Sequence, residues 1–390
     1  MGNNSVVRNY YYWEGFILCC TVSPEGINAF IDGEERVYYT EELTTDLSFY
    51  NGTNVARVAG IKAKHLAYYK ARLYLGNVDV NGTTYPQRIL FSPEGEDTFD
   101  TANDLIDDMG EPITGLKVYG GYLYVFSENK VGKYDGYAFT LIPSTGGTTN
   151  GRTIQESESR LIWYNRAGVY LYGGASVPTK ISKRVQGWID VISDSSEVIG
   201  GIDKYGRYVL NIGDVTYKGT SYTDVQLIYD VLNNNWTVET GRKFGVLTIV
   251  HDDGDITPYG ADNEYDYVYE LNTGYAVGSC GMDMKWQTAI LDMGLPEKSK
   301  DIYKAIFNYK PSGNSNFLTV EYRVNGASGW SAINNTSDNI CLSGSNNIES
   351  KELYINQLQA DYIEFRVSNN NSSGGWEIYS IDLEGRLRNE

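Results

Sequence analysis

Short apolar runs separated by tight turns recur along most of this chain. In the clearest example, residues 116–119 lead through Gly120 and Gly121 into a second run at 122–126. A Gly-Gly pair between two such runs favours a hairpin, because the turns that join antiparallel strands tightly need positive φ angles. Two further apolar runs follow before residue 143. The segment therefore predicts one sheet of four short antiparallel strands.

The same pattern returns with other residues, which predicts a repeated unit. Similar segments occupy residues 66–75, 160–172, 202–211 and, more loosely, 250–260. Each turn has one anchor position: Tyr69, Tyr119, Ser159, Tyr205 and Asp252. Successive anchors are 50, 40, 46 and 47 residues apart, which is the spacing of four-stranded propeller blades. We therefore expect a β-propeller of five or six blades over residues 1–280, with strands near 10–20 and 29–39 forming part of one blade.

One repeat resembles a kelch-type turn. Residues 227–237 contain an apolar strand, then Asp230, an asparagine-rich turn, and Trp236 at the start of the next strand. We expect the asparagine turn to reverse the chain and Trp236 to cover the gap between adjacent sheets.

Two segments depart from the strand pattern. Thr179 is a candidate cap for a short helix, because Ile181, Val185, Trp188 and Ile189 then share one helical face. Residues 101–109 are a second, acidic helix candidate. Both are expected to be excursions from the blades.

The composition changes near residue 280, which predicts a second domain over residues 281–390. Turns there are rich in Ser, Gly and Asn, and strands are predicted at 302–309, 318–324, 352–355, 362–367 and 376–383. In one of them Ile363, Phe365 and Val367 alternate with polar residues, as in a strand buried on one side. We expect a β-sandwich of the jelly-roll or immunoglobulin-like type.

The overall composition agrees with an all-β chain. Among 390 residues, 42 are Gly and 34 are Tyr, whereas only 9 are Pro. Aromatic residues suit pleated sheets, and glycine suits tight turns. The net charge of −18 argues against a phosphate-binding surface, which needs clustered Lys and Arg.

The N-terminus and the cysteines predict no targeting segment and no metal centre. The apolar run at residues 15–20 is too short to span a bilayer, and no charged segment precedes it as in a signal peptide. The four cysteines are Cys19, Cys20, Cys280 and Cys341. Because they form no CxxC pair, they predict buried thiols and no zinc site.

A search for catalytic motifs finds none. The two histidines, His65 and His251, have no Ser, Asp or Cys partner close in sequence, and the GxSxG, HExxH, GxGxxG and phosphate-loop patterns are absent. We therefore predict no catalytic residue, no metal ligand and no cofactor, that is, a protein that is not an enzyme.

Three alternatives remain open beside that prediction. Many carboxylates are available for glycoside hydrolysis, although no Asp-box repeat of the sialidase type is present. Residues 252–255 (Asp-Asp-Gly-Asp) are a candidate calcium site or an acidic hairpin turn. The run 10–13 (Tyr-Tyr-Tyr-Trp) is a candidate sugar-stacking surface or a packed strand.

Several segments resemble β-propeller proteins of tailed-bacteriophage virions. They are residues 72–77 with 88–99 (RLYLGN and RILFSPEGEDTF), 113–134, 229–236, and 288–300 (TAILDMGLPEKSK). Within that class the chain looks most like the tail nozzle or packaged-DNA stabilisation proteins of short-tailed phages, although it is shorter than the typical nozzle.

The resemblance implies a structural role in a bacteriophage tail. It implies a hexameric ring that extends the DNA channel and helps retain and eject the genome. The implied partners are further copies of the chain, the head-to-tail adaptor, and tail fibre or spike proteins, with DNA passing through unbound and no insertion into a membrane. The implied location is the virion tail, assembled in the host cytoplasm. The alternatives are a glycan-binding propeller adhesin or fibre-attachment protein, and a polysaccharide hydrolase.

Overall fold

The computed structural model shows an all-β chain that divides into two compact units, Met1–Asn272 and Thr273–Glu390, whereas the sequence placed the boundary between residues 280 and 281. The structure describes residues 9–13, 16–20, 26–40, 43–51, 53–100, 105–106, 109–143, 146–174, 177–241, 244–252, 255–261, 268–271, 276–277, 280–281, 284–311, 317–333, 340–342, 347–369 and 376–388. The predicted fold class, a β-propeller of four-stranded blades followed by a β-sandwich, is confirmed.

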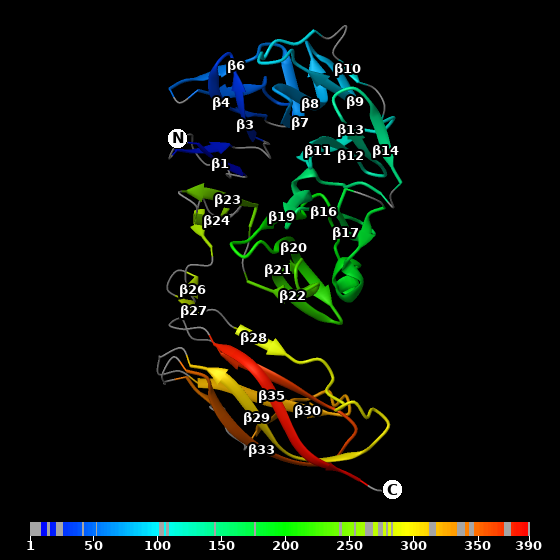
Figure 1. Cartoon of the computed structure of the whole chain (residues 1–390), viewed down its shortest axis with the longest axis vertical. Helices are drawn as coiled ribbons and strands as arrows, with labels where there is room; N and C mark the ends of the chain where they lie inside the picture. Colours follow the sequence, from blue (N-terminus) through cyan, green and yellow to red (C-terminus); the bar gives the residue numbers. More distant parts are fainter. Residues whose placement is uncertain are drawn as a thin grey trace. The chain divides into compact units, whose positions relative to one another are not determined.

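The first unit is a series of antiparallel sheets that follow one another around a ring (Figure 1). The first sheet contains β3 (Gly26–Ile31), β4 (Glu34–Tyr39), β5 (Ser48–Tyr50) and β6 (Val55–Arg57). The second contains β7 (Ile61–Tyr69), β8 (Arg72–Val80), β9 (Thr83–Phe91) and β10 (Leu105–Ile106). The third contains β11 (Ile113–Tyr119), β12 (Tyr122–Ser127), β13 (Val131–Tyr134) and β14 (Phe139–Ile142).

The remaining sheets of this unit follow in chain order. The fourth contains β15 (Gln155–Ser157), β16 (Arg160–Asn165), β17 (Gly168–Tyr172) and β18 (Thr179–Lys180). The fifth contains β19 (Ile199–Ile202), β20 (Tyr208–Tyr217), β21 (Thr220–Asp230) and β22 (Asn235–Glu239). A three-stranded sheet contains β23 (Val246–Asp252), β24 (Asp255–Ala261) and β25 (Val268–Glu270). The hairpin of β1 (Asn9–Trp13) and β2 (Phe16–Cys20) places β1 beside β23 and β3 (Figure 1).

The predicted hairpins form because their turn residues adopt the left-handed region. Gly120 and Gly121 have φ angles of 56° and 81°, and Tyr119 pairs with Tyr122 across them. The Lys70–Ala71 turn has the same geometry without glycine, at 48° and 56°. The anchors Tyr69, Tyr119, Ser159, Tyr205 and Asp252 all lie at the connection between the first two strands of their sheets, so the repeat read from the sequence is confirmed.

Neighbouring blades are joined through these same connections. Tyr69 Oη donates to the carbonyl of Gly121 at 2.8 Å, and Tyr119 Oη donates to the carbonyl of Ser159 at 2.7 Å. Buried aromatic side chains fill the space between the sheets, among them Trp163, Tyr124 and Phe126. A buried tyrosine or tryptophan whose polar tip reaches a partner combines apolar packing with a satisfied hydrogen bond.

Three local predictions are tested between the blades. Trp236 donates from Nε1 to the carbonyl of Ile181 at 3.0 Å, so it does bridge adjacent sheets. The helix predicted after Thr179 exists but begins later, as a 3₁₀ turn at Ser182–Val185 followed by α1 (Gln186–Ile189). Thr179 is not its cap, because Thr179 lies in β18 and pairs with Leu171 of β17.

The second predicted helix, at residues 101–109, is wrong. Within it, Leu105 and Ile106 form β10 and pair with Leu90 and Ile89 of β9. The second sheet therefore takes these two residues as its fourth strand, and sheet pairing overrides the weak helical pattern. No helix in the described part of the chain is long and apolar enough to cross a membrane.

The second unit is a sandwich of two antiparallel sheets. One sheet contains β28 (Met284–Gln287), β34 (Ile363–Asn369), β30 (Phe317–Val324) and β31 (Ser331–Ala332), and β32 (Ile340–Cys341) also pairs with β30. The other contains β33 (Glu349–Ala360), β29 (Lys300–Lys310) and β35 (Glu377–Leu387). A separate short hairpin contains β26 (Ala276–Val277) and β27 (Cys280–Gly281).

Both sheets contribute to one apolar core. Ile363, Phe365 and Val367 are fully buried, as the alternating pattern predicts. The ring of Phe365 meets that of Phe307 edge to face at 5.5 Å, which is a favourable aromatic geometry.

Acid is expected to weaken the sandwich through Glu364. Arg323 donates to both oxygens of this carboxylate, at 2.7 and 2.9 Å, and these bonds lower the pKa of Glu364 below its ordinary value of 4.5. A carboxyl whose pKa is depressed on folding stabilises the fold above its unfolded pKa and loses that contribution as the pH falls through its folded pKa.

The unfolding free energy of the sandwich should therefore fall as the pH drops below 4.5. Glu364→Gln should be less stable at neutral pH and should show a shallower acid dependence. Denaturant melts of both proteins across this range measure it, and parallel profiles would refute the assignment.

Candidate functional site

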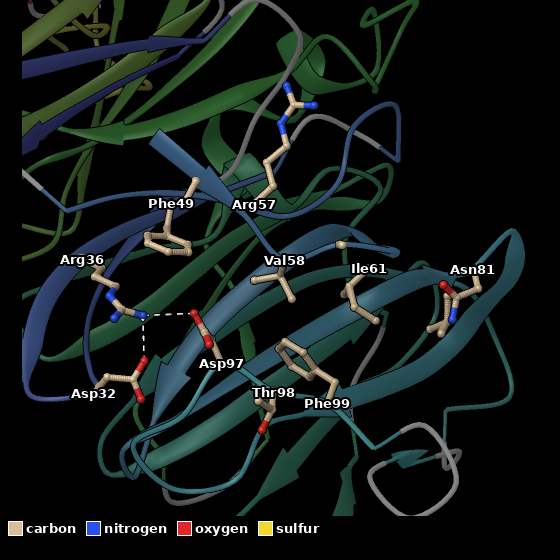
Figure 2. Close-up of a pocket in the computed structure, with 13 residues that line it drawn as sticks. Asp32, Arg36, Phe49, Arg57, Val58, Ile61, Asn81, Asp97, Thr98 and Phe99 are labelled. Atoms are coloured by element: carbon tan, nitrogen blue, oxygen red, sulfur yellow. Dashed lines mark hydrogen bonds and ion pairs between the residues drawn. The ribbon is translucent and has the colours of Figure 1, made fainter. Parts of the chain in front are cut away.

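An open pocket of about 660 Å³ lies between the first and second blades. Sites for small ligands typically have volumes of about 300–1,000 Å³. One side comes from the β3–β4 turn, β4, β5 and β6, and the other from β7, the end of β8 and the loop after β9. Figure 2 shows the residues that line it, with a charged cluster at one end and apolar side chains along the middle.

The charged cluster centres on Arg36, whose side chain is mostly buried. Its Nη1 atom lies 3.0 Å from Asp32 Oδ2 and 3.1 Å from Asp97 Oδ2 (Figure 2). Tyr38 Oη donates to the same Asp97 oxygen at 2.8 Å. The cluster therefore joins two blades through a single guanidinium group.

The surroundings of the cluster keep Arg36 charged and Tyr38 neutral. Burial alone would lower the pKa of Arg36, but the hydrogen bond with Tyr38 and the nearby carboxylates of Asp97 and Asp32 raise it overall. Burial raises the pKa of Tyr38 far above its ordinary value. Tyr38 therefore acts as a hydrogen-bond donor to Asp97 over the whole physiological pH range.

Local sequence explains how these side chains meet. Asp32 and Gly33 have φ angles of 53° and 79° and form the tight turn between β3 and β4. Arg36 and Tyr38 are two residues apart in β4, so their side chains lie on one face of the sheet. The loop carrying Asp97 is held in place by backbone hydrogen bonds from Asp32 N to Gly95 O at 2.9 Å and from Gly95 N to Ala71 O at 2.7 Å.

The middle of the pocket is apolar. The rings of Phe49 and Phe99 and the side chains of Val58 and Ile61 line it (Figure 2). The guanidinium of Arg36 lies 4.8 Å from the centre of the Phe49 ring, a cation–π contact that holds both groups. At the far end lies Asn81, while the Arg57 side chain points away from the charged cluster.

Each carboxylate of the cluster keeps one oxygen available. Asp32 and Asp97 contact Arg36 and Tyr38 through Oδ2. Within the described residues, no hydrogen bond or ion pair uses the Oδ1 atom of either side chain. The pocket therefore offers two oriented acceptors beside an apolar wall.

None of the catalytic, metal or sugar-stacking candidates named from the sequence is among the residues that line this pocket. His65 is half-buried in β7, and Asp252 and Asp255 pair at the β23–β24 turn. The side chains of His251, of residues 252–255 and of residues 10–13 lie outside the described residues, as do those of Cys19, Cys20 and Cys280. Cys341 is half-buried in β32. Among the described residues, no group of three His, Cys, Asp or Glu side chains is placed to hold a metal ion.

Sequence reasoning missed the pocket because its halves are far apart in the chain. Arg36 and Asp97 are separated by 61 residues. Asp97 lies in the 88–99 segment, but that segment was singled out for its resemblance and not as part of a binding site. The Asp32–Gly33 pair is a hairpin-turn signal that could have placed the turn. Nothing in the sequence indicates that the loop after β9 folds against it.

No protein-family model matches the chain, and no curated protein matches it. Solved structures do match. One is the exo-beta-1,3-galactanase from Phanerochaete chrysosporium with galactose, at 14% identity and a TM-score of 0.29, over 98% of this chain and 100% of the other. Two variants of that enzyme with beta-1,3-galactotriose match at 13% and 11% identity and TM-scores of 0.30 and 0.31, over 98% of this chain and 99% of theirs.

These matches overturn two predictions. The chain was predicted to be a bacteriophage tail component and not an enzyme, whereas the matched structures are those of a glycoside hydrolase. At such low identity and TM-score, however, they transfer no activity to this chain. The resemblance to virion propeller proteins, the implied partners and the implied location stay untested predictions.

Proposed function

We propose that the pocket between the first and second blades binds carbohydrate. A sugar ring presents an apolar face of C–H groups and a rim of hydroxyls that both donate and accept hydrogen bonds. The pocket presents the matching chemistry, because Phe49 and Phe99 form an apolar wall beside the Arg36 cluster. An apolar pocket with a few convergent polar groups is typical of a small-ligand site.

The Oδ1 atoms of Asp32 and Asp97, which bond to no other group in the described part of the chain, carry this proposal. Their Oδ2 atoms are already fixed by Arg36 and Tyr38, so the carboxylates need little further ordering when a ligand binds. Acceptors that are held in place before binding lose less entropy on association. Hydrogen bonds from sugar hydroxyls to ionised oxygens are also stronger than those between neutral groups.

Hydrolysis of the bound glycan is a second candidate function. Glycoside hydrolysis requires two carboxyl groups on either side of the scissile bond, and this pocket contains two on facing blades. Because both pair with Arg36, one of them would have to leave the guanidinium and take up a proton to act as the acid.

Binding can be tested with a panel of soluble polysaccharides and their disaccharides. The panel contains β-1,3-galactan, β-1,3-glucan, β-1,4-mannan, xylan and polygalacturonate. The full chain should bind at least one neutral member in calorimetric titration. Asp97→Asn should weaken that binding about tenfold or more, which corresponds to about 1.4 kcal/mol, because the ionised acceptor is lost.

The matched control is Glu94→Gln, which removes the same charge from the same loop at an exposed residue outside the pocket. It should bind as the unaltered chain does. Equal weakening by both substitutions, or no binding to any panel member, would refute the proposal. The appearance of new reducing ends, abolished by Asp97→Asn, would establish the second candidate.

A further inference from the structure

Exposed apolar side chains gather at one end of the propeller. In a four-stranded antiparallel blade the first and third turns lie at the same end, and we call this end the turn face. Six of the large hydrophobic residues exposed in the described part of the first unit lie in or next to these turns: Phe30, Val55, Tyr137, Val177, Tyr205 and Leu232. They come from the first, third, fourth and fifth sheets.

Hydrogen bonds show that these turns are neighbours around the ring. The turn of Asp32 bonds to Gly95, and Gly95 bonds to Ala71. Beside Ala71, Lys70 donates from Nζ to the carbonyl of Asp135 at 2.5 Å, two residues before Tyr137.

Further hydrogen bonds join the turns of the third, fourth and fifth blades in chain order. Tyr119 Oη reaches the carbonyl of Ser159 at 2.7 Å, and Ser157 Oγ donates to the carbonyl of Gly206, next to Tyr205. The turn face is therefore a continuous surface from the pocket at Asp32 to Tyr205.

Two aromatic rings on this surface are presented for contact. Tyr137 is 93% exposed and Tyr205 is 62% exposed. The Nζ atom of Lys70 lies 5.4 Å from the Tyr137 ring, and Lys204 and Arg207 each lie 5.1 Å from the Tyr205 ring. Exposed apolar residues that gather on one surface, unlike single scattered ones, mark interaction sites, and the two rotatable bonds of each tyrosine keep the entropy cost of contact low.

We infer that the turn face binds an extended, neutral polysaccharide, with the pocket as one subsite and Tyr137 and Tyr205 as further stacking positions. This inference rests on the proposed carbohydrate binding in the pocket, whose Asp32 and Asp97 belong to the same face. The net charge of −18 repels polyanions, which favours a neutral polymer over an acidic glycan or a nucleic acid.

The inference predicts that affinity depends on chain length. Tyr137→Ala with Tyr205→Ala should weaken binding of the neutral polymer selected from the panel by about tenfold. The same double variant should bind the corresponding disaccharide with unchanged affinity, because the pocket is intact.

Matched controls come from the other unit. Tyr354 and Tyr379, on the sandwich, are 54% and 53% exposed, so Tyr354→Ala with Tyr379→Ala removes two comparable rings outside the turn face. This control should bind the polymer normally.

Several results would overturn the inference while leaving the pocket proposal intact. They are unchanged polymer binding by the Tyr137 and Tyr205 variant, equal loss in the control, or tighter binding of polygalacturonate or single-stranded DNA than of the neutral polymer. A chain that binds no disaccharide and no polymer would instead remove the proposed function itself.

Discussion

Trp163→Ala is expected to lower the unfolding free energy of the propeller by about 3–5 kcal/mol, the usual cost of removing a large buried ring. Trp163 lies in β16 with 0% of its surface exposed. Its ring meets Phe126 edge to face at 5.4 Å and stacks on Tyr170 at 6.1 Å. Alanine would leave a cavity between the third and fourth blades that these rigid neighbours cannot fill. Denaturant melts followed by circular dichroism measure the loss.

Trp163→Phe separates packing from polarity. The Nε1 atom of Trp163 is buried and has no hydrogen-bond partner among the residues that the structure describes, and an unsatisfied buried donor costs about 1–3 kcal/mol. Phenylalanine keeps an aromatic ring and removes that donor, so it should destabilise far less than alanine. Tyr137→Ala, at a side chain that is 93% exposed, should leave stability unchanged. A Trp163→Ala melt that coincides with that of the unaltered chain would contradict the described core.

The second large effect is expected at Lys300→Met in the sandwich. Lys300 is only 1% exposed, and its Nζ donates to the carbonyls of Leu295, Lys298 and Asp361 at 2.6, 2.7 and 2.7 Å. Methionine fills a similar volume but leaves three carbonyls without their donor. At about 1–3 kcal/mol for each unsatisfied group, partly relieved by the loss of a buried charge, we expect a net loss of about 2–4 kcal/mol.

Hydrogen exchange of peptides from β29 and β33 would report this loss locally. Protection of both strands should fall in Lys300→Met. Lys298→Met is the matched control, because Lys298 is exposed and only its backbone groups bond to this segment in the described structure. Equal protection in the two variants would show that the Lys300 side chain does not hold this segment together.

Features that depend on neighbouring residues were predictable from the sequence. The Gly120–Gly121 hairpin, the anchor spacing and the alternation at Ile363, Phe365 and Val367 all follow from turn chemistry and strand periodicity. The structure confirms each of them. These features suffice to predict the fold class, because the four strands of one blade lie within about 40 residues of one another in the sequence.

Features that depend on distant partners were not predictable. The helix predicted at residues 101–109 failed because Leu105 and Ile106 pair with β9, and Thr179 failed as a cap because it pairs with Leu171. The pocket was missed for the same reason. In the sequence nothing distinguishes Arg36 from other strand residues, because its partner Asp97 lies in a loop 61 residues away.

The most direct test of the central claim is a crystal structure of the full chain with the disaccharide from the panel that binds most tightly. We predict sugar density between Phe49 and Phe99, with hydroxyls bonded to Oδ1 of Asp32 or Asp97. Density only elsewhere, whether on the propeller axis or on the sandwich, with this pocket empty at saturating sugar, would contradict the account.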